Sequence, residues 1–166
     1  MMRRFFLLFL LIQGVLFTVE ITHTVQESVI VPWTELIAAI SAWLIQLVDS
    51  QVLAHGVIIQ STANGFGVAI RPGCNGVEAA IILAAAIFAF PTKAWRHQLL
   101  GFAMGVLTIQ VLNLIRIISL FYLGQWNQTA FDWAHHYIWE VLIMLDVLMV
   151  FLIWLRMLPQ PATNAR

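Results

Sequence analysis

Long apolar segments that carry almost no charge dominate this sequence, and they limit what the chain can fold into. Four of them, at residues 5–20, 76–91, 99–123 and 135–155, approach the length of about 20 apolar residues that a helix needs to cross a bilayer. Only 10% of the 166 residues are charged and 61% are hydrophobic, whereas a typical soluble domain has about 25% charged residues. We therefore predict an all-α integral membrane protein that forms a single membrane domain over residues 1–166.

The first apolar segment follows Arg3 and Arg4, which is also how a signal peptide begins. No small-x-small cleavage site follows it, so we expect an uncleaved membrane anchor rather than a leader that is removed.

A fifth apolar segment, residues 33–48, carries polar side chains such as Glu35 between large apolar residues at helical spacing. This pattern is typical of an amphipathic helix that lies in the membrane interface. The positive-inside rule favours that interpretation, because the Arg-containing N-terminus, the loop with Lys93 and Arg96, and the tail 156–166 then all lie in the cytoplasm. We predict four spans, with the amphipathic helix outside the cytoplasm.

Residues 51–72 change character between this helix and the second span. Two β-rich runs, at 52–59 and 66–70, flank the turn sequence STANG. This arrangement predicts a small β-hairpin outside the cytoplasm, directly before Cys74.

The charge and cysteine content exclude several classes of function. Eight Lys and Arg residues balance eight Asp and Glu residues, so no basic field is available to attract nucleic acid. A single cysteine excludes an intramolecular disulfide and a multi-cysteine metal site. His23, His55 and His97 have no ligand-spaced neighbours. We expect no metal, no cofactor and no nucleic-acid partner, and a lipid bilayer as the surroundings.

Arg116 is the cation that the topology does not explain. It lies inside the third span, seven residues before Leu123, which places it about 10 Å from the outer end of the helix. A buried arginine at that depth costs at least a few kcal/mol unless it is paired or hydrated. Its presence indicates either a functional site, snorkelling to the outer headgroups, or a structural pair with Glu78 or Glu140.

Cys74 lies at the outer start of the second span, in the sequence RPGCNGVEA. The Pro72–Gly73 turn predicts that the helix begins at or just after the cysteine, with the positive end of its dipole near the sulfur. A helix N-terminus and a nearby arginine lower the pKa of a thiol, as a nucleophile requires. The alternatives are a small buried residue or a lipidation site. Asn75 would offer an amide close to the sulfur.

His135 and His136 begin the fourth span on the same outer side. The topology therefore brings a thiol, a guanidinium and an imidazole to about the same depth, which are the groups that thiol acyl transfer needs. Neighbouring residues on a helix point about 100° apart, so periodicity leaves open which histidine faces the other helices. Glu78 and Asn113 are candidates for orienting the arginine.

Three sequence motifs occur in a fixed order and on one side of the membrane: CNGVEA at 74–79, NLIR at 113–116 and HHYIW at 135–139. They resemble the motifs of the exosortase/archaeosortase family. The resemblance covers about residues 31–155, and the short chain and the sequence IRPGCNGVEA are most similar to the exosortase H type.

The resemblance implies a cysteine protease or transpeptidase, multi-pass in the bacterial inner membrane, with its active site facing the periplasm. Its substrates would be membrane-anchored exported proteins whose C-terminal sorting signal is cleaved through a thioacyl-enzyme intermediate. By the same resemblance, Cys74 is the nucleophile and Arg116 the stabilising cation. The proton carrier is His135, four residues before Trp139, with His136 as the alternate.

A non-enzymatic membrane scaffold or assembly factor is the alternative from a different class. In that case Arg116 would form a structural pair with Glu78, and Cys74 would be an inert buried thiol. A small transporter is a third possibility, disfavoured because the spans hold so few charges.

The predicted topology can be tested with a reporter fused after Arg96. We expect this reporter in the cytoplasm, because the loop that precedes it carries Lys93 and Arg96. Fluorescent and secreted-phosphatase fusions measure the two sides independently, and a reporter found outside would contradict the four-span topology.

Overall fold

Helices make up most of the fold in the computed structural model, which describes residues 2–92 and 94–158. Lys93 and the tail residues 159–166, on which part of the topology prediction depends, lie outside the described residues. The helical elements are α1 (Met2–Glu20), α2 (His23–Val25), α3 (Val31–Gln46), α4 (Val77–Ala89), α5 (Trp95–Trp126), α6 (Gln128–Trp133) and α7 (Trp139–Arg156), with two π-helical turns, η1 (Gln26–Ile30) and η2 (Ala134–Ile138).

Four helical segments of the described chain are long and apolar enough to cross a membrane, which agrees with the predicted fold class. Three of these segments include predicted spans, and the fourth includes α3 in place of the predicted span at 76–91. The helix predicted at 76–91 is α4, whose 13 residues rise only about 20 Å, while the continuous helical segment that includes α3 has 24 residues. The qualifying segments are Met2–Glu20, His23–Gln46, Trp95–Trp126 and Gln128–Arg156.

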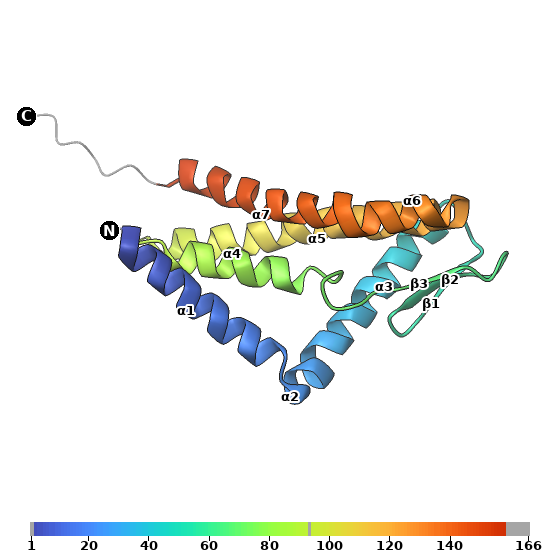
Figure 1. The fold of residues 1–166 in the computed structure, drawn as a ribbon, viewed down its shortest axis with the longest axis horizontal. Coiled ribbons are helices and arrows are strands. Elements are labelled where there is room, and N and C mark those ends of the chain that lie inside the picture. The colour runs from blue at the N-terminus through green and yellow to red at the C-terminus, as the bar shows by residue number, and fades with distance from the viewer. Residues whose placement is uncertain (1, 93, 159–166) are drawn as a thin grey trace, which may run out of the picture.

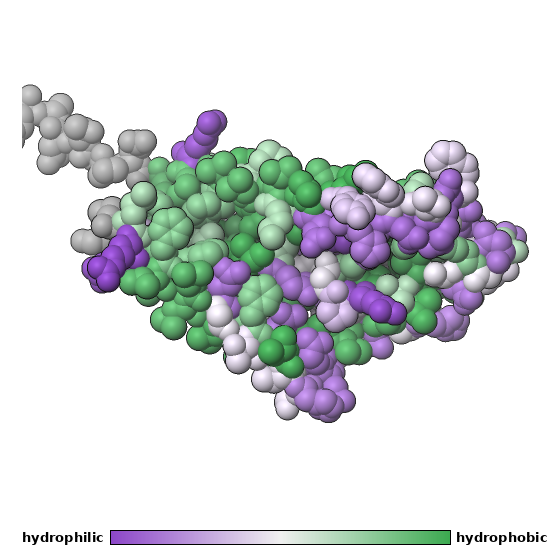
Figure 2. Space-filling model, viewed as in Figure 1, coloured by the Kyte–Doolittle hydropathy of each residue, from purple (hydrophilic) through white to green (hydrophobic). Residues whose placement is uncertain are grey.

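The helices α4, α5 and α7 run side by side, and α1 packs against α4 (Figure 1). The start of α1, the junction of α4 with α5 and the end of α7 all lie at one end of this bundle. Hydrophobic residues dominate that half of the molecule, with a few strongly hydrophilic residues at its extremity, whereas polar residues gather at the opposite end (Figure 2). The cations Arg3, Arg4, Arg96 and Arg156 thus belong to the same end, as the positive-inside argument requires.

The helix α3 does not join the bundle along its length. It meets α1 at α2 and then runs obliquely toward the polar end, where it packs on the sheet and on α5 (Figure 1). Leu36 and Trp43 of this helix are 50% and 60% exposed, so apolar surface is left for lipid. The placement of residues 33–48 in the membrane interface stays a prediction.

The predicted hairpin at 51–72 is a three-stranded antiparallel sheet, with β1 (Val52–His55), β2 (Ile58–Ser61) and β3 (Gly67–Ala69) in that order. The run read as one strand, 52–59, is broken by Gly56, whose φ of +55° allows a tight two-residue turn between β1 and β2. The prediction of two strands was therefore wrong, because a glycine inside an apolar run was not read as a turn.

Two apolar cores hold these parts together. The first lies between α3, the sheet and the outer part of α5, and Ile37, Ile59 and Phe121 are its centre. The second lies between α4, α5 and α7 and includes Leu83 and Trp154. The segment that joins the sheet to α4 lies where the two cores meet.

Close packing of α5 in the second core depends on glycine. A methyl group on Gly105 would lie 2.5 Å from the Leu83 side chain and 2.9 Å from that of Val150. One turn earlier, Gly101 lies against the Trp154 ring. Small residues four apart are the common device by which membrane helices approach closely.

We expect the substitution Gly105→Ala to destabilise the fold by about 1–3 kcal/mol, because the added methyl group overpacks this contact. The matched control is Gly14→Ala in α1, where a methyl group meets nothing within 4 Å and the stability should be unchanged or slightly higher. Unfolding temperatures in detergent measure both. Equal effects of the two substitutions would contradict the packing argument.

Candidate active site

Cys74 lies in the short segment between β3 and α4. Its N–H donates to the carbonyl of Arg71 at 2.9 Å, which closes a turn. Gly73 and Gly76 on either side have φ values of +86° and +77°, which favour glycine. The helix α4 begins only after Gly76, so the sulfur lies near its N-terminus but outside its first turn.

Asn75 fastens this segment to α3. Its side chain is fully buried and donates from Nδ2 to the Thr34 hydroxyl at 3.0 Å, while its Oδ1 accepts the Val77 N–H at 3.1 Å. The indole N–H of Trp33 donates to the Asn75 carbonyl at 3.2 Å. The Asn75 side-chain amide, expected close to the sulfur, makes its hydrogen bonds to α3 and to the start of α4 instead.

Glu78 also holds the cysteine segment rather than the arginine. Its Oε1 accepts the N–H of Gly73 at 2.5 Å. In the described part of the chain, no carboxylate lies within 4 Å of the Arg116 guanidinium, and this includes Glu140. The structural Arg–Glu pair on which the scaffold alternative depends is therefore not formed.

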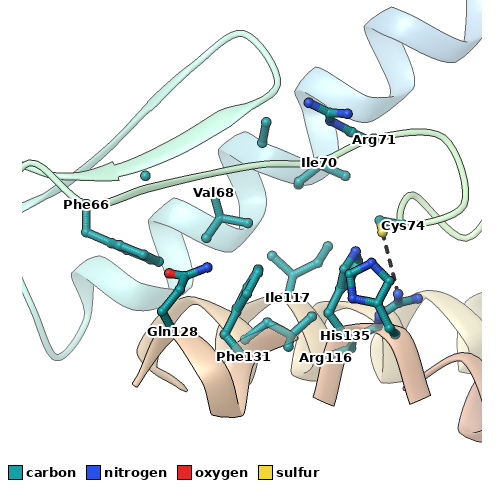
Figure 3. A pocket seen from close by; sticks show the side chains of 14 residues that line it. Phe66, Val68, Ile70, Arg71, Cys74, Arg116, Ile117, Gln128, Phe131 and His135 are labelled. Carbon is teal, nitrogen blue, oxygen red and sulfur yellow. Dashed lines mark hydrogen bonds between the residues drawn. The ribbon is translucent and has the colours of Figure 1, made fainter. Parts of the chain in front are cut away.

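Arg116 points from α5 at the cysteine segment and is only 4% exposed. Its Nη2 donates to the Cys74 sulfur at 3.5 Å, and its Nη1 donates to the Gly73 carbonyl at 3.4 Å (Figure 3). Its Nε–H is buried and has no partner among the described residues. Within the described residues, the site thus holds a buried guanidinium that faces a thiol. At least one of its N–H groups has no acceptor, and no carboxylate balances its charge.

Asn113, one turn before Arg116, does not orient it. The side chain is 3% exposed, and neither its Nδ2 nor its Oδ1 has a hydrogen-bond partner in the described chain. It faces a small cavity that Arg116 and Asp146 also line. No hydrogen bond within the described residues therefore supports the expectation that Asn113 orients the arginine.

The two histidines lie in the π-helical turn η2, which separates α6 from α7. His135 is half-buried, stacks on Phe131 and has a buried Nδ1 without a partner. His136 is exposed, and its Nδ1 lies 2.9 Å from the carbonyl oxygen of Asp132 in its own helix. Periodicity could not separate the two residues, but the structure gives them different surroundings. A π turn inside a helix is itself frequent at functional sites.

Two pockets meet at Cys74, Arg116 and the histidine pair. One, of about 360 Å³, lies beneath the sheet, between the segment 66–71 and the helices α5 and α6. In Figure 3, Phe66, Val68 and Ile70 point into it, whereas Arg71 points away from the Cys74–Arg116 pair. The other, of about 270 Å³, extends between α4 and α7, with Glu78 and Glu140 in its wall. The three residues predicted to act together are thus in one place, at the junction of two pockets.

The Cys74 thiol is less acidic than the sequence suggested. Burial, the largest influence, raises its pKa above the ordinary value, and the Glu78 carboxylate raises it too, whereas the Arg116 guanidinium and a backbone hydrogen bond from Arg71 lower it without reversing the net rise. The predicted lowering by arginine is present, but removal of the sulfur from water outweighs it. A reaction at this thiol near neutral pH therefore needs a base to take its proton.

Some residues that build the site were not expected from the sequence. Phe131, which packs against His135 with 5.7 Å between ring centroids, lies in α6, before the predicted start of the fourth span. The missed signal is Asn127, whose side chain caps α6 by accepting the Ala130 N–H. Within residues 2–92 and 94–158, no three side chains gather as metal ligands would.

Comparison with known proteins gives one finding. A family model described as "Transmembrane exosortase (Exosortase_EpsH)" matches residues 1–154 of the chain. No curated protein and no solved structure matches it.

The thiol geometry predicts a pH profile. Because burial raises the pKa of Cys74, we expect its alkylation by iodoacetamide to have a midpoint above about 8.5, the ordinary value for cysteine. The substitution Arg116→Met should move the midpoint further up, since it removes the charge that favours the thiolate, and Arg116→Lys should move it less. Cys74 is the only cysteine, so mass spectrometry of the labelled protein reports on it alone. A midpoint below 8.5 would contradict the burial argument.

Proposed function

The chain belongs to the transmembrane exosortase family, and we propose on this premise that it is a membrane-embedded cysteine protease and transpeptidase. Its substrates are exported proteins that carry a C-terminal sorting signal, and the reaction proceeds through a thioacyl-enzyme intermediate. Cys74 is the nucleophile, Arg116 the stabilising cation and His135 the proton carrier.

The observation that carries this proposal is the buried Arg116 guanidinium, which faces the Cys74 sulfur and has no carboxylate within 4 Å in the described chain. A buried charge is normally paired, because leaving it unpaired in a low dielectric is costly. Here the missing negative charge is one that the reaction supplies. A thiolate, and then a tetrahedral oxyanion, would form beside the guanidinium.

In the acylation step, His135 accepts the thiol proton and the Cys74 sulfur attacks the carbonyl carbon of the scissile peptide bond. The electron pair of the C=O bond moves to oxygen, where the N–H groups of Arg116 stabilise it, including the Nε–H that has no partner in the described chain. When the oxyanion collapses, the C–N bond breaks and His135 gives its proton to the leaving nitrogen. The products are a thioester on Cys74 and a free amine.

In the second step, an acceptor amine or water attacks the thioester while His135 takes its proton, and the thiol is restored. His135 is favoured over His136 because its ring is half-buried and its Nδ1 is free of backbone partners. The His136 ring, in contrast, is exposed and held by the Asp132 carbonyl.

The arrangement of the pockets also fits this substrate class. The pocket between α4 and α7 includes Ile82, Ile143 and Met144 of the helical bundle, beside which a cleaved transmembrane helix would stay. The other pocket lies beneath the sheet, which belongs to the polar end of the molecule, where the exported part of the substrate would lie. We propose that this polar end faces the periplasm of a bacterial inner membrane.

The test is cleavage, in cells, of an exported reporter that ends in a short motif, an apolar helix and a basic tail. We expect Cys74→Ala to lower the cleavage rate by about 10³-fold or more, because it removes the attacking atom. Arg116→Met should lower it by about 10²–10³-fold through loss of oxyanion stabilisation. Immunoblots of the reporter measure the loss of its tail.

The two histidines supply a matched pair for the same assay. His135→Ala should abolish cleavage, whereas His136→Ala should leave most of it, since the His135 ring is half-buried at the site with an unpartnered Nδ1, while the His136 ring is exposed. Cleavage that survives Cys74→Ala would overturn the enzymatic proposal in favour of a scaffold. The reverse result for the histidines would exchange their roles.

A further inference from the structure

The outer edge of β3 is open. β3 ends the sheet, and within the described residues it makes extensive contacts only with β2. The Phe66 carbonyl and the Ile70 N–H bond to the β2 side of the sheet. Because inward and outward backbone groups alternate along an antiparallel strand, Gly67 and Ala69 direct their N–H and C=O groups away from β2.

This open edge borders the pocket that leads to Cys74. Gly67 and Ala69 are exposed and line the pocket beneath the sheet, with α6 and η2 on its far side. No hydrogen bond from any other described part of the chain reaches their backbone groups. Edge strands are usually protected by charged side chains, proline or a covering element, and this one carries none of these.

We propose that β3 is the binding site for an extended peptide, which adds to the sheet as a fourth strand and delivers its scissile carbonyl to Cys74. Main-chain hydrogen bonds to Gly67 and Ala69 give this site its affinity, as in other cases of strand addition. The inference rests on the proposed function, because it names the way in which the acyl part of the substrate is held.

The direction of the bound peptide follows from the chemistry. The part that becomes bonded to Cys74 is N-terminal to the scissile bond, and it occupies the pocket beneath the sheet. β3 itself runs from Gly67 toward Cys74. The peptide therefore lies parallel to β3, so that the Ala69 N–H donates to a peptide carbonyl and the Gly67 and Ala69 carbonyls accept peptide N–H groups.

The test uses two alkylating probes on the full-length protein in detergent. One is iodoacetamide, and the other is acetyl-tetraalanyl chloromethyl ketone. The Cys74 thiolate displaces chloride from the CH₂ carbon of this ketone, so that a C–S bond forms as the C–Cl bond breaks. Ala69→Pro removes one N–H from the open edge without touching the β2 ladder, a position at which an edge strand tolerates proline. We expect Ala69→Pro to lower the rate of Cys74 alkylation by the peptide probe by about 3- to 10-fold, which corresponds to the loss of one hydrogen bond. The rate of alkylation by iodoacetamide should be unchanged.

The matched control is Ala54→Pro in β1. Ala54 holds the corresponding outward position on the opposite edge of the same sheet, away from the pocket. Ala54→Pro should change neither alkylation rate. Ala69→Gly keeps the N–H, so both of its alkylation rates should equal those of the parent protein. A peptide probe with methylated main-chain nitrogens cannot donate to the β3 carbonyls, so it should alkylate Cys74 of the parent protein more slowly than the unmethylated probe does. Equal rates for the two probes would show that the β3 carbonyls do not bind the peptide.

Each other outcome counts against the proposal. Equal peptide-probe rates for Ala69→Pro and the parent protein, or an equal loss with Ala54→Pro, would overturn strand addition while leaving the cysteine chemistry standing. Failure of both probes to label Cys74 in the parent protein would instead overturn the proposed function, and this inference with it. The iodoacetamide rate also shows that the site of each variant is intact.

Discussion

The buried guanidinium of Arg116 is the interaction on which the rest of the site depends. It is 4% exposed, it bonds to the Cys74 sulfur and the Gly73 carbonyl, and no carboxylate lies within 4 Å of it in the described chain. Such a charge is costly unless hydrogen bonds or a negative charge compensate it, and in the proposed reaction a thiolate and an oxyanion supply that negative charge. The fold therefore has to bring a nucleophile to this cation and keep it there.

Much of the molecule serves that placement. α3 and the sheet form one apolar core, α4, α5 and α7 form another, and the cysteine segment is tied to both. Asn75 fastens the segment to α3 through Thr34, and Glu78 fastens it to the start of α4 through the Gly73 N–H. The short helix α4 thus supports the segment that carries Cys74, and its prediction as a membrane span stays a prediction.

The same placement makes the thiol a weak acid. Burial raises the pKa of Cys74 although Arg116 opposes this, so the resting site holds a protonated thiol beside a cation. In the proposed reaction one of the histidines then has to remove the thiol proton before the sulfur can attack. The π turn sets the two apart, with His136 held by its own helix and His135 left free.

The amino-acid sequence determined the class of the protein and the participants of the site. Scarce charge and long apolar segments specify a membrane fold, and an arginine inside such a segment is conspicuous because it is costly there. The sequence therefore sufficed to propose Cys74, Arg116 and a histidine as one site, and the structure brings these residues to the same pockets. Only the tertiary structure decided what those residues contact. In the folded chain, Asn75 bonds to Thr34 of α3 and Glu78 accepts the Gly73 N–H. The sheet has a third strand, β3, whose outer edge is open beside the pocket that leads to Cys74. Hydrogen-bond partners and burial depend on segments far apart in the chain, and local periodicity carries no information about which of them meet.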